Sequence, residues 1–239
     1  MEKTKIAKLQ LKRAMDVSQL QCLRGAVNKL LCEQDGSWEA NLLFHNHEDS
    51  RLRYGYPLVQ YRSCNGQTTI VGIGEAANAV QNLASIGRLQ LKLGDRETIL
   101  DVDRCEETYY TPQIYDEPKL YRLSRYIALT DNNLHEYREL LALTDKIMML
   151  EKILVGNILS FFKGIGHYTD QQLAAVITDM DGQEEIKYKS VRFRTFRLRF
   201  VSNVELPDGI GLGKSASVGF GTLQREKLNT KLIKKYANG

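Results

Sequence analysis

The chain has 239 residues, of which 43% are hydrophobic and 26% charged, and its formal net charge is +4. This composition excludes a disordered chain and suits one large domain or two domains of roughly 100 to 150 residues each. The four cysteines are widely spaced and form no CxxC pair, which argues against a zinc knuckle and favours free thiols in a reducing compartment.

The apolar segments bear on the location of the protein. The N-terminal segment MEKTKIAKLQLKR alternates charged and apolar residues and lacks the continuous apolar region of a secretory signal. The most apolar stretch, 147–162, is interrupted by Glu151 and Lys152. The uncharged run after them is shorter than the roughly 20 residues of a membrane span. We therefore expect a cytoplasmic protein without a membrane-bound segment.

The first half of the chain alternates strand-like and helix-like patterns. Asp16 and Gln19 have the spacing of a capping box, so a helix is expected to begin there. The order of elements is β-α-β-β-α, the start of a ferredoxin-like fold whose last strand would follow near RLQLKL. In chain order the expected elements are a strand at 5–12, the helix after Asp16, strands in NLLFHNH and YPLVQYRS, a small helix in EAANAVQNLASIG to which TTIVGIG leads, and a hairpin over 88–110 turning near Gly94-Asp95.

The second half repeats this plan loosely. TPQIYDEPK reads as a linker, and Asp181-Gly182 is a strong hairpin signal. We expect an α+β protein of two tandem ferredoxin-like (RRM-like) domains, 1–112 and 113–239. The expected elements after the linker are a strand in KLYRLSRYIAL, a helical region over 131–163, strands in QLAAVITDM and EEIKYKSV paired across Asp181-Gly182, and a long strand in RFRTFRLRFVS.

Positive charge gathers in the last quarter of the chain. Residues 183–239 hold twelve Lys and Arg against five Asp and Glu. A bulge near Thr195 would place all the arginines of RFRTFRLRF on one face of the strand. Such a face fits a nucleic-acid backbone, the alternative being a half-buried strand with an arginine-rich outer side. The candidate RNA-binding arginines are Arg192, Arg194, Arg197 and Arg199.

A glycine-rich loop, GLGKSASVGFG, follows this strand at 211–221. Position 208 is aspartate, not the first glycine of a P-loop, and the sequence after Ser215 does not favour a helix, so ATP binding is disfavoured. Backbone N–H groups of such a loop can still bind a phosphate, and the alternative is a turn that closes a sheet. The candidate contacts are Gly211, Gly213, Lys214, Ser215, Ser217, Gly219 and Gly221.

Two histidines, His45 and His47, lie two residues apart in FHNHE, so on a strand they would share one face. No further Cys or His cluster completes a zinc site, and we expect no metal ion and no cofactor. We favour acid–base catalysis as the function of the two histidines. Tyr54 follows them shortly in the sequence, and Lys29 lies on the helix expected before them. Such groups can cleave RNA by removing a proton from the ribose 2′-OH and protonating the departing 5′-oxygen.

With FHNHE, YGYPLVQYRS and GIGLGKSASVGFG in this order, the chain resembles the CRISPR-associated repeat-processing endoribonucleases of the repeat-associated RNA-binding protein superfamily. The resemblance implies two ferredoxin-like domains and metal-independent cleavage of each repeat, leaving a 5′-hydroxyl and a 2′,3′-cyclic or 3′-phosphate. It places the catalytic histidine in the His45/His47 pair, with Tyr54 beside it and Lys29 across from it, and makes 211–221 an RNA-contacting loop.

The resemblance implies CRISPR repeat RNA as the partner, with other CRISPR-associated effector subunits and a second copy of the chain as further candidates. The alternative is a non-catalytic RNA-binding scaffold subunit of a CRISPR ribonucleoprotein. Its fold and basic strand would be the same, but a pure binder does not need two imidazoles on one strand face. Which histidine is the acid and which the base stays open.

Overall fold

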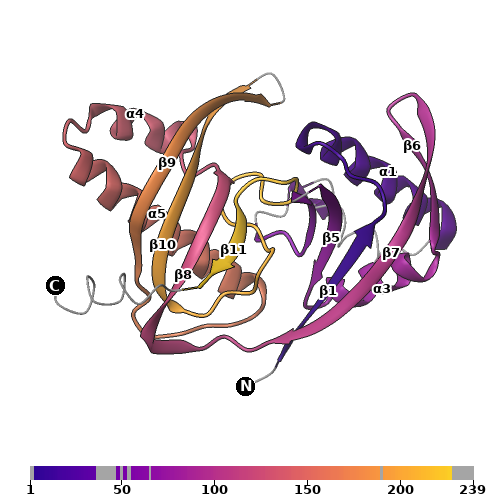
Figure 1. The fold of residues 1–239 in the computed structure, drawn as a ribbon, viewed down its shortest axis with the longest axis horizontal. Coiled ribbons are helices and arrows are strands. Elements are labelled where there is room, and N and C mark those ends of the chain that lie inside the picture. Colours follow the sequence, from indigo (N-terminus) through magenta and orange to yellow (C-terminus); the bar gives the residue numbers. More distant parts are fainter. Residues whose placement is uncertain are drawn as a thin grey trace. The chain divides into compact units, whose positions relative to one another are not determined.

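The structure is a computed structural model, and it describes residues 3–35, 47–48, 51–52, 55–64, 66–188 and 191–227. The chain forms two compact units, each with its own antiparallel sheet and helices (Figure 1). Unit 1 is made of 1–111, 160–167 and 215–220, and unit 2 of 112–159, 168–214 and 221–239.

The sheet of unit 1 has the strand order β4-β5-β1-β7-β6. Its first four strands in this order, together with two helices, give the connectivity of a ferredoxin-like domain. The elements of unit 1 are β1 (Thr4–Leu11), α1 (Val17–Asp35), β2 (His47–Glu48), β3 (Arg51–Leu52), β4 (Val59–Cys64), β5 (Gln67–Ile73), α3 (Ala76–Ser85), β6 (Arg88–Leu93) and β7 (Arg96–Tyr110).

The last strand of the first ferredoxin-like domain is not RLQLKL, as we expected, but β7. The register pairs β1 with β7, from Thr4 opposite Tyr110 to Leu11 opposite Val102, whereas β6 pairs only with β7 and forms the edge. The hairpin turn at Gly94-Asp95 is confirmed. Because this turn reverses the chain once more, β7 rather than β6 runs antiparallel to β1.

Helix α1 begins where the sequence predicted. The Asp16 backbone N–H donates to the Gln19 side chain at 3.0 Å, the bond of a capping box in which the third helical residue reaches back. Leu20, Leu23 and Val27 bury the apolar face of the helix. Asn28, which follows Val27, is a polar residue that is also buried, with only 3% of its surface exposed.

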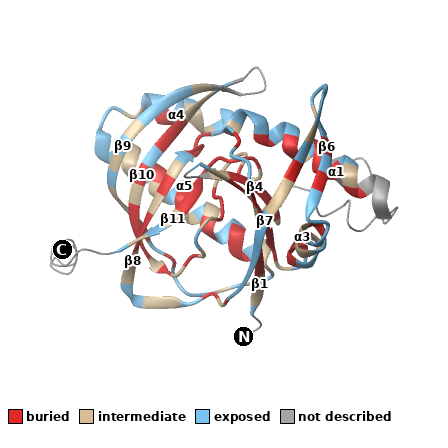
Figure 2. Cartoon of the chain, turned by 45° about the vertical axis from the view of Figure 1, so that its right-hand side comes forward, coloured by how far each residue is buried: buried red, intermediate tan, exposed pale blue. Residues whose placement is uncertain are grey.

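Helix α3 approaches the sheet closely because β5 has a glycine beneath it. A Cβ on Gly72 would lie 2.5 Å from the Ala76 carbonyl oxygen and 2.7 Å from a methyl carbon of Val80. Ala76 and Val80 are themselves fully buried. Figure 2 shows buried positions along β1 and β4, the strands that form the core with these helices.

The sheet of unit 2 has the order β11-β8-β10-β9, again the ferredoxin-like arrangement. The expected α+β fold of two tandem ferredoxin-like domains is therefore confirmed. Residues 205–221 join β10 to β11 and contain no helix, so this loop stands where the second helix of the motif would be. The elements are β8 (Ile114–Tyr126), α4 (Asp131–Glu139), α5 (Leu143–Gly164), β9 (Ala175–Tyr188), β10 (Val191–Val204) and β11 (Thr222–Glu226), the last residues of α5 belonging to unit 1.

The hairpin expected at Asp181-Gly182 is wrong. Both residues lie inside β9, whose two halves pair with β10. Leu198 is opposite Met180 and Arg197 is opposite Gly182, so Asp181 is an extra residue in β9. The Asp-Gly pair thus forms a β-bulge and not a turn. Glycine is common at such bulges because it has no side chain to pack.

Two further expectations need correction. The linker is shorter than TPQIYDEPK, because β8 already begins at Ile114. The helical region over 131–163 is two helices, since Leu140 is extended with ψ of 122° and ends α4. Among the described residues, no helix is both long and apolar enough to cross a membrane.

We predict that Gly72→Ala destabilises the protein by about 1–3 kcal/mol, because the new methyl group has no room beneath α3. The matched control is Gly156→Ala, in an exposed part of α5 where no atom lies within 4 Å of the new Cβ. That change is expected to stabilise by about 0.5–1 kcal/mol through helix propensity. Urea unfolding of both variants tests the prediction, and equal effects would contradict it.

Candidate functional site

One residue of the histidine pair lies in a small hairpin of unit 1, and this residue is His47. His47 opens β2 and is opposite Leu52 of β3 in the register. The other two predicted residues of this region, His45 and Tyr54, lie outside the described residues. The structure therefore places the backbone of His47 on a strand, as FHNHE predicted, and the catalytic roles of these side chains stay predictions.

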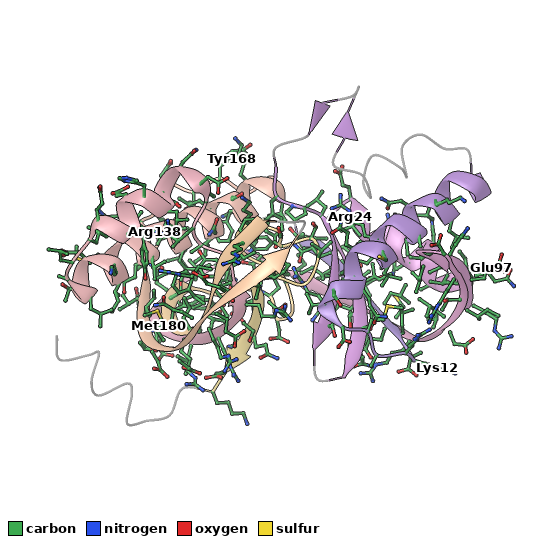
Figure 3. All side chains as sticks on the ribbon, turned by 90° about the horizontal axis from the view of Figure 1, so that it is seen from above. Lys12, Arg24, Glu97, Arg138, Tyr168 and Met180 are labelled. Atoms are coloured by element: carbon green, nitrogen blue, oxygen red, sulfur yellow. The ribbon has the colours of Figure 1, made fainter. Side chains whose placement is uncertain are left out.

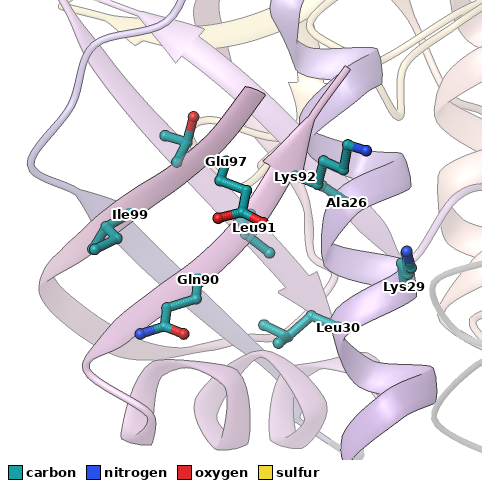
Figure 4. Close-up of a pocket in the computed structure, with 9 residues that line it drawn as sticks. Ala26, Lys29, Leu30, Gln90, Leu91, Lys92, Glu97 and Ile99 are labelled. Carbon is teal, nitrogen blue, oxygen red and sulfur yellow. The ribbon is translucent and has the colours of Figure 1, made fainter. Parts of the chain in front are cut away.

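Lys29, the fourth predicted catalytic residue, is exposed on α1 and lines an open pocket of about 500 Å³ (Figure 4). The pocket lies between α1 and the β6–β7 hairpin, and Lys92 of β6 is a second lysine in its lining. Glu97 adds a carboxylate, so the pocket carries both signs of charge. The apolar lining residues are Ala26, Leu30, Leu91 and Ile99.

The glycine-rich loop is hydrogen-bonded at two points to β8 of unit 2 and to the residue that follows this strand. The Lys214 N–H donates to the Ile127 carbonyl at 3.1 Å, and the Gly221 N–H donates to the Arg125 carbonyl at 3.1 Å. Arg125 has a φ of +53° and lies in a stretch of β8 that has an extra residue relative to β10. The bulge turns this carbonyl toward the loop.

The middle of the loop, 215–220, belongs to unit 1 and runs beside β4. The Tyr61 N–H donates to the Ser217 carbonyl at 2.8 Å, and Tyr61 forms a parallel bridge with Val218. Arg62 is only 2% exposed and donates from Nη1 to the Phe220 carbonyl at 3.0 Å and from Nη2 to Gln60. Burial lowers the pKa of Arg62 to about 10, so its guanidinium is still charged at neutral pH.

Three glycines of the loop, Gly213, Gly219 and Gly221, lie where neighbouring atoms leave no room for a side chain. A Cβ on Gly221, whose φ is +59°, would lie 1.8 Å from the Leu212 carbonyl oxygen. A Cβ on Gly213, with a φ of +85°, would lie 2.6 Å from the Tyr126 ring. The predicted contact residues divide into buried Gly211, Gly219 and Gly221 and half-buried Gly213, Lys214, Ser215 and Ser217. The accessible part of the loop is therefore its middle, 213–217, apart from the buried Ala216.

Lys214 contacts an aromatic ring within unit 2. Its Nζ lies 4.6 Å from the centroid of the Phe193 ring, a cation–π geometry. The next residue, Ser215, has a φ of +59°, which is rare for a residue with a side chain. The ammonium group thus lies over an aromatic ring of β10, a partner that is not a carboxylate.

The arginines of β10 do not form one basic face. The bulge that we expected near Thr195 is absent, because the register to β9 runs unshifted from Arg194 through Phe196. Thr195 and Phe196 are both buried, and the two pairs of arginines keep opposite parities along the strand. The bulges lie instead in β9 and β8, the neighbours of β10.

Carboxylates of β9 and β11 also neutralise most of this charge. Arg199 lies 2.8 Å from Asp179 and 3.0 Å from Glu226. The remaining predicted positions are Arg194, 3.6 Å from Glu185, Arg197, 3.5 Å from Glu184, and the exposed Arg192. An RNA phosphate would have to compete with these carboxylates, so an arginine-rich strand is a weaker indicator of RNA binding than its sequence suggests.

Sequence analysis did not single out Arg24 and Arg62. Arg62 lies in YPLVQYRS, where Val59 to Arg62 are all buried and strand alternation gives no signal. Arg24 is a half-buried residue of α1, and its Nη1 lies 3.2 Å from the Ser217 Oγ. Among the described residues, no group of three His, Cys, Asp or Glu side chains could hold a metal ion.

The two domains of one protein family match the two halves of the chain. The Cas6b N-terminal domain matches residues 2–110, and the Cas6b C-terminal domain matches residues 113–226. The chain belongs to the Cas6b family. A curated relative, an uncharacterised protein of Methanocaldococcus jannaschii, is 38% identical over 103 residues, which are 43% of this chain and 69% of the relative.

Solved Cas6b structures have the same fold. A crystal structure of Cas6b superposes with a TM-score of 0.78 at 23% identity, covering 94% of this chain and all of that one. A second, described as the CRISPR RNA processing endoribonuclease Cas6b, superposes with a TM-score of 0.68 at 21% identity over the same shares. A type IV Cas6 crRNA endonuclease, Csf5, has a TM-score of 0.57 at 12% identity, covering 95% of this chain and all of that one.

We predict that Arg62→Ala costs about 3 kcal/mol of stability, because the Phe220 carbonyl loses a charged donor in a buried site. The matched control is Arg88→Ala, whose ion pair with Asp101 spans 2.9 Å but is exposed. That change should cost less than about 1 kcal/mol. Denaturant unfolding measures both, and a loss below about 1 kcal/mol for Arg62→Ala would contradict the prediction.

Proposed function

We propose that this Cas6b chain is a metal-independent endoribonuclease that cleaves CRISPR repeat RNA in precursor transcripts to make guide RNAs. The observation that carries the proposal is the match of both Cas6b domains, in order, over residues 2–110 and 113–226. The endoribonuclease and crRNA-endonuclease descriptions of proteins with this fold support it. The RNA-product complex of another Cas6, with a TM-score of 0.54, supports RNA as the partner.

The proposed reaction needs no external nucleophile. The ribose 2′-oxygen attacks the adjacent phosphorus as a base removes its proton, and the bond from phosphorus to the 5′-oxygen breaks as an acid protonates that oxygen. The products of this step are a 2′,3′-cyclic phosphate and a 5′-hydroxyl, and hydrolysis of the cyclic phosphate by water would give a 3′-phosphate. DNA lacks the attacking hydroxyl, so the mechanism itself selects RNA.

His45 and His47 are the proposed acid and base, since a histidine gains and loses a proton near neutral pH. Tyr54 and Lys29 are the proposed supporting groups, with the Lys29 ammonium stabilising the charge that builds on the phosphate. The exposure of Lys29 on α1 supports this role, because a side chain must reach the RNA to act on it. The RNA strand itself is proposed to bind at Lys214, Ser215 and Ser217, the accessible part of the glycine loop, and at Arg192.

We predict that the purified protein cleaves its repeat RNA at one position in the presence of EDTA. A single 2′-deoxy substitution on the ribose 5′ of the cleaved bond should abolish cleavage and leave binding unchanged, because it removes only the nucleophile. Single-turnover cleavage and equilibrium binding of the same RNA measure the two effects. Cleavage that continues without this hydroxyl would contradict the mechanism.

We predict that His45→Ala or His47→Ala lowers the single-turnover rate by about 10² to 10⁴-fold, the usual contribution of a general acid or base. The control is His135→Ala, an exposed histidine of α4 that pairs with Glu139 at 3.3 Å. Lys29→Ala should slow the chemical step, whereas Lys92→Ala, in the same pocket, should leave it unchanged. If both histidine variants kept the full rate, the assignment of the catalytic histidines would be wrong, whereas wild-type protein that bound repeat RNA without cutting it would be a non-catalytic scaffold subunit.

A further inference from the structure

Arg24 projects from α1 to the middle of the glycine loop within unit 1 (Figure 3). Its Nη1 donates to the Ser217 hydroxyl at 3.2 Å. The Ser217 backbone is itself fixed, because its carbonyl accepts the Tyr61 N–H at 2.8 Å. A guanidinium has five N–H donors, and the bond to Ser217 uses one of them.

The partner of Arg24 sets it apart from the arginines of β10. Within the part of the chain that the structure describes, Arg24 hydrogen-bonds to a neutral hydroxyl, whereas Arg194, Arg197 and Arg199 each pair with a carboxylate. An ion-paired arginine adds almost no net field, but an arginine beside a hydroxyl keeps its full positive charge. Arg24 is half-buried, so its charge is also less screened than that of an exposed side chain.

Tyr61, whose phenol interacts electrostatically with Arg24, does not neutralise the positive charge of Arg24. Tyr61 is fully buried, and its burial raises the pKa of the phenol, an effect that the positive charge of Arg24 opposes. The phenol therefore stays neutral at physiological pH and adds no counter-charge. The contact thus combines a positioned cation, a hydroxyl and a rigid loop backbone.

We propose that Arg24 and the Ser217 hydroxyl bind one phosphate of the RNA. Arginine binds phosphate through two parallel N–H bonds, and a hydroxyl can donate a third. Because the loop already positions both groups, little conformational entropy is lost when the phosphate binds. The inference rests on the proposed function, and it adds a helix residue to a phosphate site that sequence analysis confined to the loop.

The salt dependence of RNA binding tests this assignment. Each phosphate contact to a single strand adds about 0.7 to the slope of log affinity against log salt concentration. We expect Arg24→Ala to weaken repeat-RNA binding about tenfold and to lower this slope by about 0.7 between roughly 50 and 200 mM salt. A loss of affinity at unchanged slope would instead show that Arg24 only holds the loop, and would overturn the proposal.

Three comparisons complete the experiment. Ser217→Ala should keep the slope, since the charge remains, and should weaken binding only a few-fold. Arg197→Ala, which removes an ion-paired and exposed arginine, should change the slope much less than Arg24→Ala. If Arg24→Ala does not fold, Arg24→Lys and Arg24→Gln are compared, and only the glutamine variant should lower the slope; equal slopes would overturn the proposal.

These results are separable from the proposed activity. Wild-type protein that binds repeat RNA without cutting it would refute the nuclease proposal, while the slope of Arg24→Ala would still decide the phosphate site. Cleavage by the wild type with an unchanged slope in Arg24→Ala would refute only the phosphate site.

Discussion

The structure of unit 1 depends on a charged side chain in its core. Arg62 is buried in β4, and its donors reach Gln60 and the carbonyl of Phe220, a residue about 160 positions further along the chain. A buried guanidinium is costly unless it is hydrogen-bonded, so unit 1 is stable only when the loop carbonyl is in place. This requirement couples the position of the glycine loop to the folding of the N-terminal sheet.

The close packing of the loop against its neighbours also explains why it contains glycines. Gly221 and Gly213 have positive φ angles and no space for a Cβ, so their role is to let the backbone turn tightly against its neighbours. A loop of this composition suggests an open phosphate cradle, but here the side chains around it carry the accessible chemistry. The neutral partners of Lys214 and Arg24, a phenylalanine ring and a serine hydroxyl, leave these two cations able to attract an anion.

Much of the fold could be predicted because it depends on local patterns. Strand alternation and the capping pair Asp16 and Gln19 are local signals, and they predicted most of the elements of both ferredoxin-like domains. The pairings that decide the site are not local. Asp-Gly serves equally well in a turn and in a bulge, so only the register of β9 with β10 shows which it is. Likewise, the carboxylates that neutralise Arg199 come from two other strands, which the sequence of β10 cannot reveal.

We infer that the protein holds the loop in its proposed RNA-binding position before any RNA arrives. Hydrogen–deuterium exchange at the Tyr61 amide, which donates to the Ser217 carbonyl at 2.8 Å, tests it directly. We expect this amide to be protected in the free protein about as strongly as the amides of β5, and added repeat RNA to change its protection little. Rapid exchange in the free protein that becomes slow only with RNA bound would contradict the account.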